Sequence, residues 1–122
     1  MIEDPNGYRG LAHSVSAQLK SLRASTPEVM KGFNELGRAA TAAGVLDAKT
    51  KELIAVALSV AARCDPCIAF HTQALVKLGA TRQELDETLG VATYMGGGPS
   101  LMYAASAVAA FDEFAQAGAA PR

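Results

Sequence analysis

The chain has 122 residues, of which half are apolar but only 6% aromatic, and a formal net charge of -1. This length fits one domain with a modest core, and the near-neutral charge argues against nucleic acid as a partner. Because small side chains bury little area each, we expect the subunit to hide further apolar surface by forming a homo-oligomer.

The first residues of the chain and its two cysteines indicate in which cellular compartment the protein functions. Residues 1–4, Met-Ile-Glu-Asp, lack the basic segment and apolar run of a secretion signal. The longest almost wholly apolar run, residues 53–62, is too short to span a bilayer, so we expect no membrane association. Two cysteines without an export signal indicate the reducing cytoplasm, where a Cys-x-x-Cys pair is usually catalytic or metal-binding.

The hydrophobic pattern is helical along the whole chain, because no segment sustains a two-residue alternation. We expect about six helices in a single all-α domain that spans residues 1–122. The first is amphipathic, with apolar residues at helical spacing: Leu11, Val15, Leu19 and Leu22. The second opens at Thr26-Pro27-Glu28, as N-cap, first-turn proline and early acid. We expect its apolar residues to point inward: Val29, Met30, Phe33 and Leu36.

Four further helices follow from caps and breaks. Asp47 caps a third helix that runs to about Arg63, and its apolar surface on every side beyond Leu53 predicts full burial. Asp65-Pro66 is typical of an N-cap and a first-turn proline, so a fourth helix should begin inside residues 64–67 and end at Gly79. Thr81 and Glu84 form a capping box for the fifth helix. The glycine triplet 96–98 precedes a last helix that ends near residue 117.

The candidate chemistry lies at Cys64, Cys67 and His71, which are the only two cysteines and an imidazole four residues beyond the second. Backbone N–H groups in the first turn of a helix favour thiolate over thiol, which applies to Cys67. His71 projects from the same helix face one turn later and can accept the thiol proton. Cys64 lies just outside the helix, where it can attack a sulfenic acid on Cys67. We therefore assign Cys67 as the activated sulfur and Cys64 as the resolving one.

Glu52 is the candidate carboxylate that would orient His71 and stabilise its charged form. The third helix rises about 18 Å between Glu52 and Cys64, whereas His71 lies only about 9 Å beyond the turn. A simple antiparallel hairpin would leave the two side chains offset by about 10 Å, too far for direct contact. A steep helix crossing, a bridging water or a neighbouring subunit would then be needed to bring Glu52 to the site.

Taken in order, Glu52-x11-Cys64-x2-Cys67-x3-His71 resembles the active-site pattern of the alkylhydroperoxidase D family, within the carboxymuconolactone decarboxylase-like superfamily. The resemblance extends from about residue 27 to 114 and includes three further segments: residues 46–53, 78–81 and 95–99. It implies an all-helical fold, assembly as a trimer or a hexamer of dimers, and hydroperoxide reduction through a Cys64–Cys67 disulfide. It assigns Cys67 to the peroxide, Cys64 to the reducing partner, and Glu52 and His71 to the proton relay.

The same resemblance implies an external thiol reductant, such as a lipoyl- or thioredoxin-type protein, and this chemistry requires no metal, flavin or haem. One position departs from the family's peroxidase type, which has a second histidine just before its inner cysteine, where this chain has Pro66. That departure counts against the same lipoyl-bearing reductant and against strong peroxidase turnover. Decarboxylases of the superfamily generally lack the cysteine pair.

Two other functions remain open at this stage. The chain could be a carboxymuconolactone decarboxylase-like enzyme that acts on a small lactone, with incidental cysteines. It could also be a non-catalytic redox-sensing or zinc-binding module. In that case Cys64, Cys67 and His71 would supply three zinc ligands, with Glu52 or His13 as the fourth.

Overall fold

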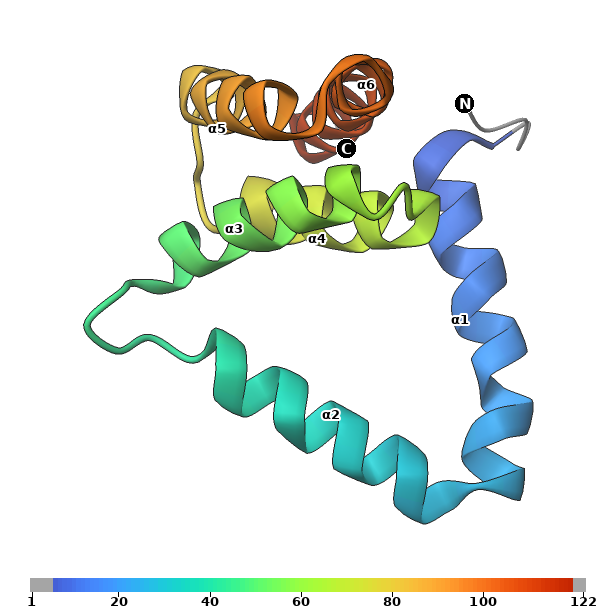
Figure 1. Ribbon diagram of the computed structural model, residues 1–122. Helices are drawn as coiled ribbons and strands as arrows, with labels where there is room; N and C mark the ends of the chain where they lie inside the picture. The colour runs from blue at the N-terminus through green and yellow to red at the C-terminus, as the bar shows by residue number, and fades with distance from the viewer. Residues whose placement is uncertain (1–5, 120–122) are drawn as a thin grey trace.

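Six α-helices make up most of residues 6–119, the part of the chain that the computed structural model describes (Figure 1). They are α1 Gly7–Ser25, α2 Pro27–Thr41, α3 Ala48–Ala61, α4 Asp65–Lys77, α5 Arg82–Gly96 and α6 Gly98–Ala119. No strand occurs in this range, so the expected all-α class with six helices is confirmed. The expectation about a secretion signal concerns residues 1–4, which lie outside it.

Helices α3 to α6 pack as two layers, with the α3–α4 pair against the α5–α6 pair (Figure 1). The core between them is formed by fully or almost fully buried side chains from all four helices: Val56, Val60, Ile68, Leu75, Leu85, Leu89, Phe111 and Phe114. Buried alanines on α6 let this helix approach the others closely: Ala104, Ala107 and Ala110. We call helices α3–α6 the bundle.

The helix ends of the bundle mostly follow the caps expected from the sequence. The Asp47 carboxylate accepts a hydrogen bond of 2.7 Å from the Thr50 N–H. Thr81 and Glu84 form both hydrogen bonds of a capping box. The predicted N-cap of α4 was wrong by one residue, because it is Cys64 and not Asp65. The helix does begin between the two cysteines, as expected.

Helices α1 and α2 form an arm that extends away from the bundle (Figure 1). Its attachment lies at the start of α1, where Tyr8 and Ala12 are buried. There the Glu113 carboxylate of α6 accepts hydrogen bonds from the Tyr8 and Arg9 N–H groups, both 3.0 Å long. Further along α1, the apolar face that the sequence predicted is only partly covered, and Leu22 on it is exposed.

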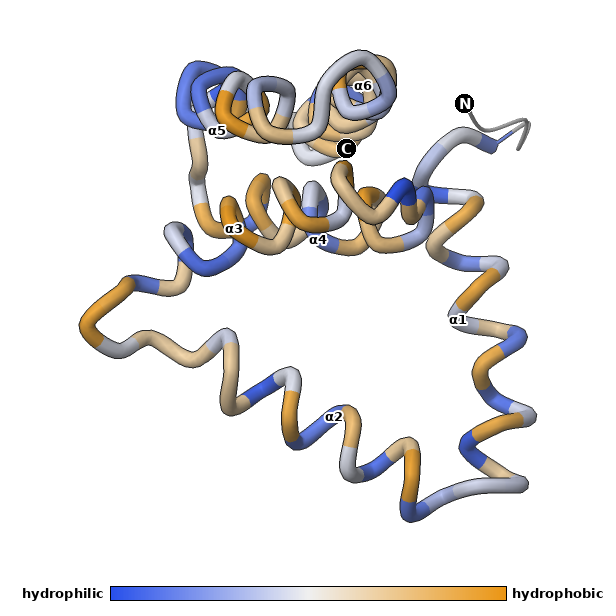
Figure 2. The backbone as a smooth tube through the Cα atoms, in the orientation of Figure 1, coloured by the Kyte–Doolittle hydropathy of each residue, from blue (hydrophilic) through white to orange (hydrophobic). Residues whose placement is uncertain are grey.

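Helix α2 has no buried residue, although hydrophobic residues recur along it (Figure 2). The expectation that its apolar residues point into the core of the chain is therefore wrong: Val29 and Phe33 are 69% exposed and Leu36 64%. Thr26 stands at the N-cap position of α2 but does not cap it, because its hydroxyl donates to the Leu22 carbonyl instead.

The expected burial of α3 on every side is also wrong, because the bundle covers only part of this helix. Ile54 and Leu58 are exposed on α3. Periodicity identifies an apolar surface, but whether another element covers that surface depends on the tertiary arrangement. None of the described helices is both long and apolar enough to cross a bilayer.

Candidate active site

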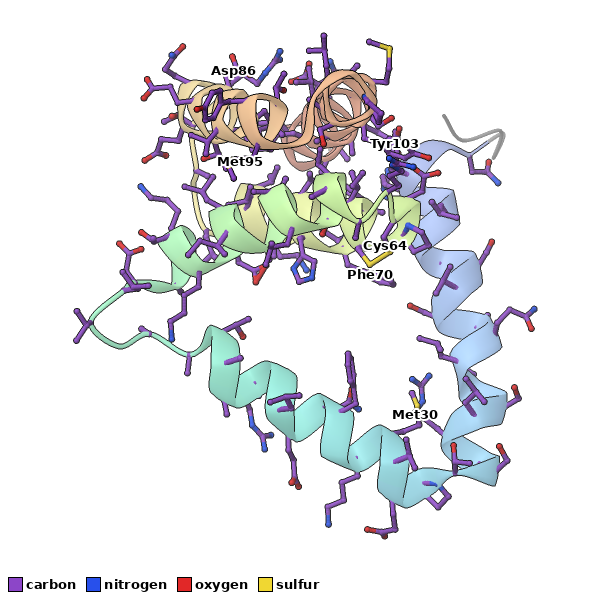
Figure 3. The ribbon with its side chains drawn as sticks, viewed as in Figure 1. Met30, Cys64, Phe70, Asp86, Met95 and Tyr103 are labelled. Carbon is purple, nitrogen blue, oxygen red and sulfur yellow. A yellow bond between two sulfur atoms is a disulfide. The ribbon has the colours of Figure 1, made fainter. Side chains whose placement is uncertain are left out.

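Cys64 and Cys67 form a disulfide at the start of α4, with their Cα atoms 5.2 Å apart. Figure 3 shows this sulfur pair at the edge of α4, on the side away from α5 and α6, with Phe70 beside it. The Cys67 N–H lies 3.3 Å from Cys64 Sγ, so Cys64 caps the helix that carries its partner. The structure thus describes the oxidised pair, and it places Cys67 in the first helical turn as the sequence predicted.

A tight C-terminal cap of α3 brings Cys64 to this position. The Arg63 N–H donates to the Val60 carbonyl, and the Cys64 N–H donates to the Ser59 carbonyl, both at 3.1 Å. This is the hydrogen-bond pattern of a Schellman motif. Its left-handed residue is Arg63, with φ 58°, at a position where glycine is usual. The motif reverses the chain within three residues, so that the end of α3 leads directly into the start of α4.

Glu52 and His71 are in direct contact within one chain, at 2.6 Å between Glu52 Oε1 and His71 Nδ1. The Glu52 side chain is 10% exposed and that of His71 is 35% exposed. With a carboxylate at Nδ1, the neutral imidazole carries its proton on that nitrogen, and Nε2 is left to accept a proton from another group. The pair therefore has the arrangement of an oriented general base.

The expected offset between Glu52 and His71 was wrong because it counted helical rise as far as Cys64, three residues beyond the end of α3 at Ala61. Helix α3 ends at Ala61, so the helical rise from Glu52 to its end is only about 14 Å. The corresponding rise from the start of α4 at Asp65 to His71 is about 9 Å. The two side chains span the remaining difference of about 5 Å. Neither a bridging water nor a second subunit is needed for this contact.

A polar group that sequence reasoning missed lies behind the cysteine loop. One carboxylate oxygen of Asp65 and the hydroxyl of Ser106 are buried without a hydrogen-bond partner among the described residues. Tyr8 lies near both. Burial raises the pKa of the Tyr8 hydroxyl; the nearby Ser106 hydroxyl opposes this, and the Asp65 and Glu113 carboxylates add to the increase. Asp65 lies between the two cysteines in sequence, but no pattern in the chain links it to Tyr8 or Ser106.

His13 lies on α1, in a hollow of about 690 Å³ that also contacts α4 and α6 through Phe70, Gln73 and Glu113. Among residues 6–119, no group of three or more His, Cys, Asp and Glu side chains is placed to hold a metal ion. The structure therefore does not gather His13 or Glu52 with the cysteines and His71 into the four-ligand set of the zinc alternative.

Comparison with known proteins identifies close relatives along most of the chain. The model of the carboxymuconolactone decarboxylase family matches residues 27–110. An uncharacterized protein of Cupriavidus necator is 45% identical over 98 residues, which cover 80% of this chain and 87% of that protein. An uncharacterized protein encoded in the cox locus of Paracoccus denitrificans is 34% identical, covering 80% of this chain and 88% of that protein.

Two solved structures share the fold. The crystal structure of a carboxymuconolactone decarboxylase family protein from Legionella pneumophila, in its apo form, is 58% identical, with a TM-score of 0.87 and coverage of 88% of this chain and 96% of that one. A family member from Thermotoga maritima, described as possibly involved in antioxidative response, is 30% identical, with a TM-score of 0.79 and coverage of 88% and 92%.

Proposed function

Because the chain belongs to the carboxymuconolactone decarboxylase family, we propose that it is a thiol-dependent peroxidase of the alkylhydroperoxidase D-like kind. The observation that carries this proposal is the pairing of a helix-start Cys64–Cys67 disulfide with the Glu52–His71 contact one turn away. The description of the Thermotoga maritima relative as possibly antioxidative agrees with it. The family also includes decarboxylases, so membership alone does not distinguish the two chemistries, and the cysteine and histidine geometry supports the redox one.

The proposed reaction begins on the reduced protein. The Cys67 thiolate attacks the terminal oxygen of a hydroperoxide, the O–O bond breaks, and the leaving alkoxide takes a proton to become an alcohol. Cys67 is now a sulfenic acid. The Cys64 thiol attacks it, a Cys64–Cys67 disulfide forms, and water leaves. An external dithiol, of the lipoyl or thioredoxin type, then reduces the disulfide by exchange and is itself oxidised to a disulfide.

His71 serves this sequence as the proton carrier, and Glu52 as its positioning residue. Nε2 can take the Cys67 thiol proton and return it to the alkoxide. The contact at Nδ1 fixes the tautomer that this transfer needs and stabilises the imidazolium formed in between. All the proposed steps use only these four side chains, Glu52, Cys64, Cys67 and His71.

A stoichiometric pulse of cumene hydroperoxide on the reduced protein tests the mechanism. Mass spectrometry should show one Cys64–Cys67 disulfide per peroxide consumed. Cys64→Ser should instead retain a sulfenic acid on Cys67, which dimedone traps, and Cys67→Ser should consume no peroxide. If no Cys64–Cys67 disulfide forms, or if Cys67→Ser reacts as fast as the native chain, the mechanism is wrong.

The proton relay is tested by the rate of Cys67 oxidation. His71→Gln should slow it about 100-fold, the lower end of what a general acid–base group contributes. Glu52→Gln should slow it less, because the imidazole is still present but its tautomer is no longer fixed. Glu87→Gln, an exposed carboxylate on α5, is the matched control and should react like the native protein. Equal rates for all three variants would exclude the relay.

The family match also supports a second candidate, decarboxylation of a small lactone. In that case replacing both cysteines with serine should leave lactone turnover intact. Loss of all activity in the double variant, with the helical content unchanged, would count against this candidate.

A further inference from the structure

The loop that joins the two cysteines carries a carboxylate that the proposed mechanism does not use. Asp65 is the first residue of α4 and follows Cys64 directly in sequence. One of its carboxylate oxygens is buried and has no hydrogen-bond partner among residues 6–119. In the same part of the chain, no ion pair joins Asp65 to a cation. Buried polar atoms without partners are rare in folded proteins, and redox and catalytic sites are among the places where they occur.

Two residues from other helices enclose this oxygen. Tyr8 of α1 is 7% exposed and Ser106 of α6 is 2% exposed, and the Ser106 hydroxyl is likewise buried without a partner among the described residues. Burial raises the pKa of the Tyr8 hydroxyl; the Ser106 hydroxyl opposes this, and the Asp65 carboxylate adds to the increase. The charge of Asp65 therefore lies within electrostatic reach of Tyr8, on the side of the loop that faces α1 and α6.

The two sulfurs lie on the other side of the same loop. Figure 3 shows the pair at the edge of α4, away from α5 and α6. Standard bond lengths keep the Asp65 carboxylate within about 10 Å of the Cys64 sulfur. Because the carboxylate oxygen is buried, the loop and not bulk water separates the two groups, and salt screens their interaction little. At an effective dielectric constant of about 20, two negative charges at this distance alter an equilibrium roughly tenfold.

The carboxylate and a thiolate also depend on the same helix end. Unpaired N–H groups at the start of α4 stabilise negative charge, and Asp65 is the acidic residue of this first turn. Pro66 contributes no N–H group to it. The Cys67 N–H is directed at Cys64 Sγ, at 3.3 Å. The helix end thus offers few donors, and Asp65 competes for its positive potential with any thiolate formed there.

The other charged groups near the loop are paired or exposed. Glu113 of α6 accepts hydrogen bonds from two N–H groups at the start of α1. Glu52 of α3 is in contact with His71 of α4. Arg63, in the turn before Cys64, is exposed. Among the described carboxylates of this region, Asp65 is therefore the one whose charge no hydrogen bond or ion pair offsets.

We propose that Asp65 sets the redox equilibrium of the cysteine pair. Its carboxylate disfavours the thiolate that forms on reduction, and so it favours the Cys64–Cys67 disulfide. The reduced pair then gives up its two electrons more readily to an oxidant such as a hydroperoxide. This inference concerns the equilibrium between dithiol and disulfide, and its tests do not require peroxidase activity.

Equilibration with dithiothreitol tests the proposal. Two electrons and two protons pass from the reagent to the Cys64–Cys67 disulfide, and the reagent closes to a cyclic disulfide. At about pH 9 one proton of the reduced pair is released, which leaves a thiolate. In Asp65→Asn, which removes the charge at nearly constant shape, the equilibrium constant for reduction should rise about tenfold, or about 30 mV.

Glu87→Gln is the matched control, because it removes the same charge from an exposed carboxylate on α5. Its equilibrium constant should stay within about twofold of the native value, since solvent and salt screen an exposed charge. Thiol labelling and mass spectrometry measure the reduced fraction in all samples. A native constant in Asp65→Asn, or an equal increase in both variants, would overturn the proposal.

The same measurement at lower pH separates an effect of charge from an effect of structure. At about pH 6 both thiols keep their protons, so reduction creates no charge for Asp65 to repel. Native protein and Asp65→Asn should then agree within about twofold. A tenfold difference that persists at this pH would mean that the substitution acts by deforming the loop, and it would contradict the proposal.

The ultraviolet absorbance of the thiolate gives an independent readout on the reduced protein. Asp65→Asn should form its thiolate at lower pH than the native chain, whereas Asp65→Glu, which keeps the carboxylate, should titrate closer to the native chain. Thiolate formation at the native pH in Asp65→Asn would contradict the proposal.

A second variant covers a loss of folding. Should Asp65→Asn lose its helical circular dichroism, Asp65→Ser allows the same comparison with a smaller uncharged side chain. A folded Asp65→Ser with the native equilibrium constant would overturn the proposal. Failure of the proposed peroxidase function would leave all these measurements unchanged, so the two proposals fail separately.

Discussion

The bundle and the arm are built from helices of the same kind, yet they bury their apolar residues to opposite extents. Ile68 and Leu75 of α4 are completely buried, whereas Phe33 of α2 is mostly exposed. Both regions show apolar residues at helical spacing, so the difference lies in what surrounds each helix. The bundle covers most of its apolar side chains within the chain, whereas those of α2 remain exposed.

The candidate active site belongs to the bundle but lies open toward the arm. Its four side chains come from α3 and α4, and the contact between Glu52 and His71 needs no part of the arm. The separation has a physical advantage. The contact between Glu52 and His71 is held by helices that the bundle core fixes in place.

The largest expected effect is the difference in stability lost when a large apolar side chain is truncated in the bundle or in the arm. Leu75→Ala should lower the free energy of unfolding by about 2–5 kcal/mol, because it leaves a cavity in the bundle. Phe33→Ala, at a protein concentration where the chain is monomeric, should cost less than about 0.5 kcal/mol, since it removes an exposed side chain. Urea unfolding followed by circular dichroism measures both. Similar costs at low concentration would mean that α2 is packed within its own chain.

The second effect compares two threonines at helix starts. Thr81→Ala should cost about 1 kcal/mol, because it removes the capping box of α5. Thr26→Ala should cost clearly less, because the Thr26 hydroxyl does not cap α2. Urea midpoints of the two variants give the comparison. If Thr26→Ala were the more damaging, the arm would depend on its caps more than the bundle does.

The third effect concerns the turn that positions Cys64. Arg63→Gly should stabilise the fold by about 0.5–1 kcal/mol, because glycine relieves the left-handed conformation at a smaller entropic cost. Gly79→Ala is the matched control at the equivalent position after α4, with φ 77°, and should destabilise by a similar amount. Thermal unfolding of both variants gives the signs. A destabilising Arg63→Gly would show that the arginine side chain makes a contribution larger than the strain.

The smallest effect is a pH dependence at the point where the arm joins the bundle. Burial raises the pKa of Tyr8 in the folded chain above its usual value of 10.0. The folded state therefore holds this proton more tightly than the unfolded state, so the contribution is fully present below pH 10.0 and is lost as the pH rises through the folded pKa. Urea unfolding at increasing pH should show a smaller loss for Tyr8→Phe than for the native chain. An identical loss in both would assign it to other groups.

Much of the candidate site was predictable because its signals are local. The first-turn proline at Pro66 correctly placed Cys67 at a helix start and His71 one turn later. The contact between Glu52 and His71 was not predictable, because it depends on α3 ending at Ala61. The sequence placed that end at about Arg63, two residues too late, because the left-handed position is occupied by an arginine and not by the usual glycine.

The sequence by itself determined that the chain is all-helical, where Asp47 and Thr81 start their helices, and that two sulfurs and an imidazole share one helix end. These features depend on hydrogen bonds and side-chain spacing within a few residues. Only the tertiary structure decided which apolar faces are covered, since α2 and the core helices have the same periodicity. Burial depends on which elements arrive from elsewhere in the chain, or from another chain, and no local pattern contains that information.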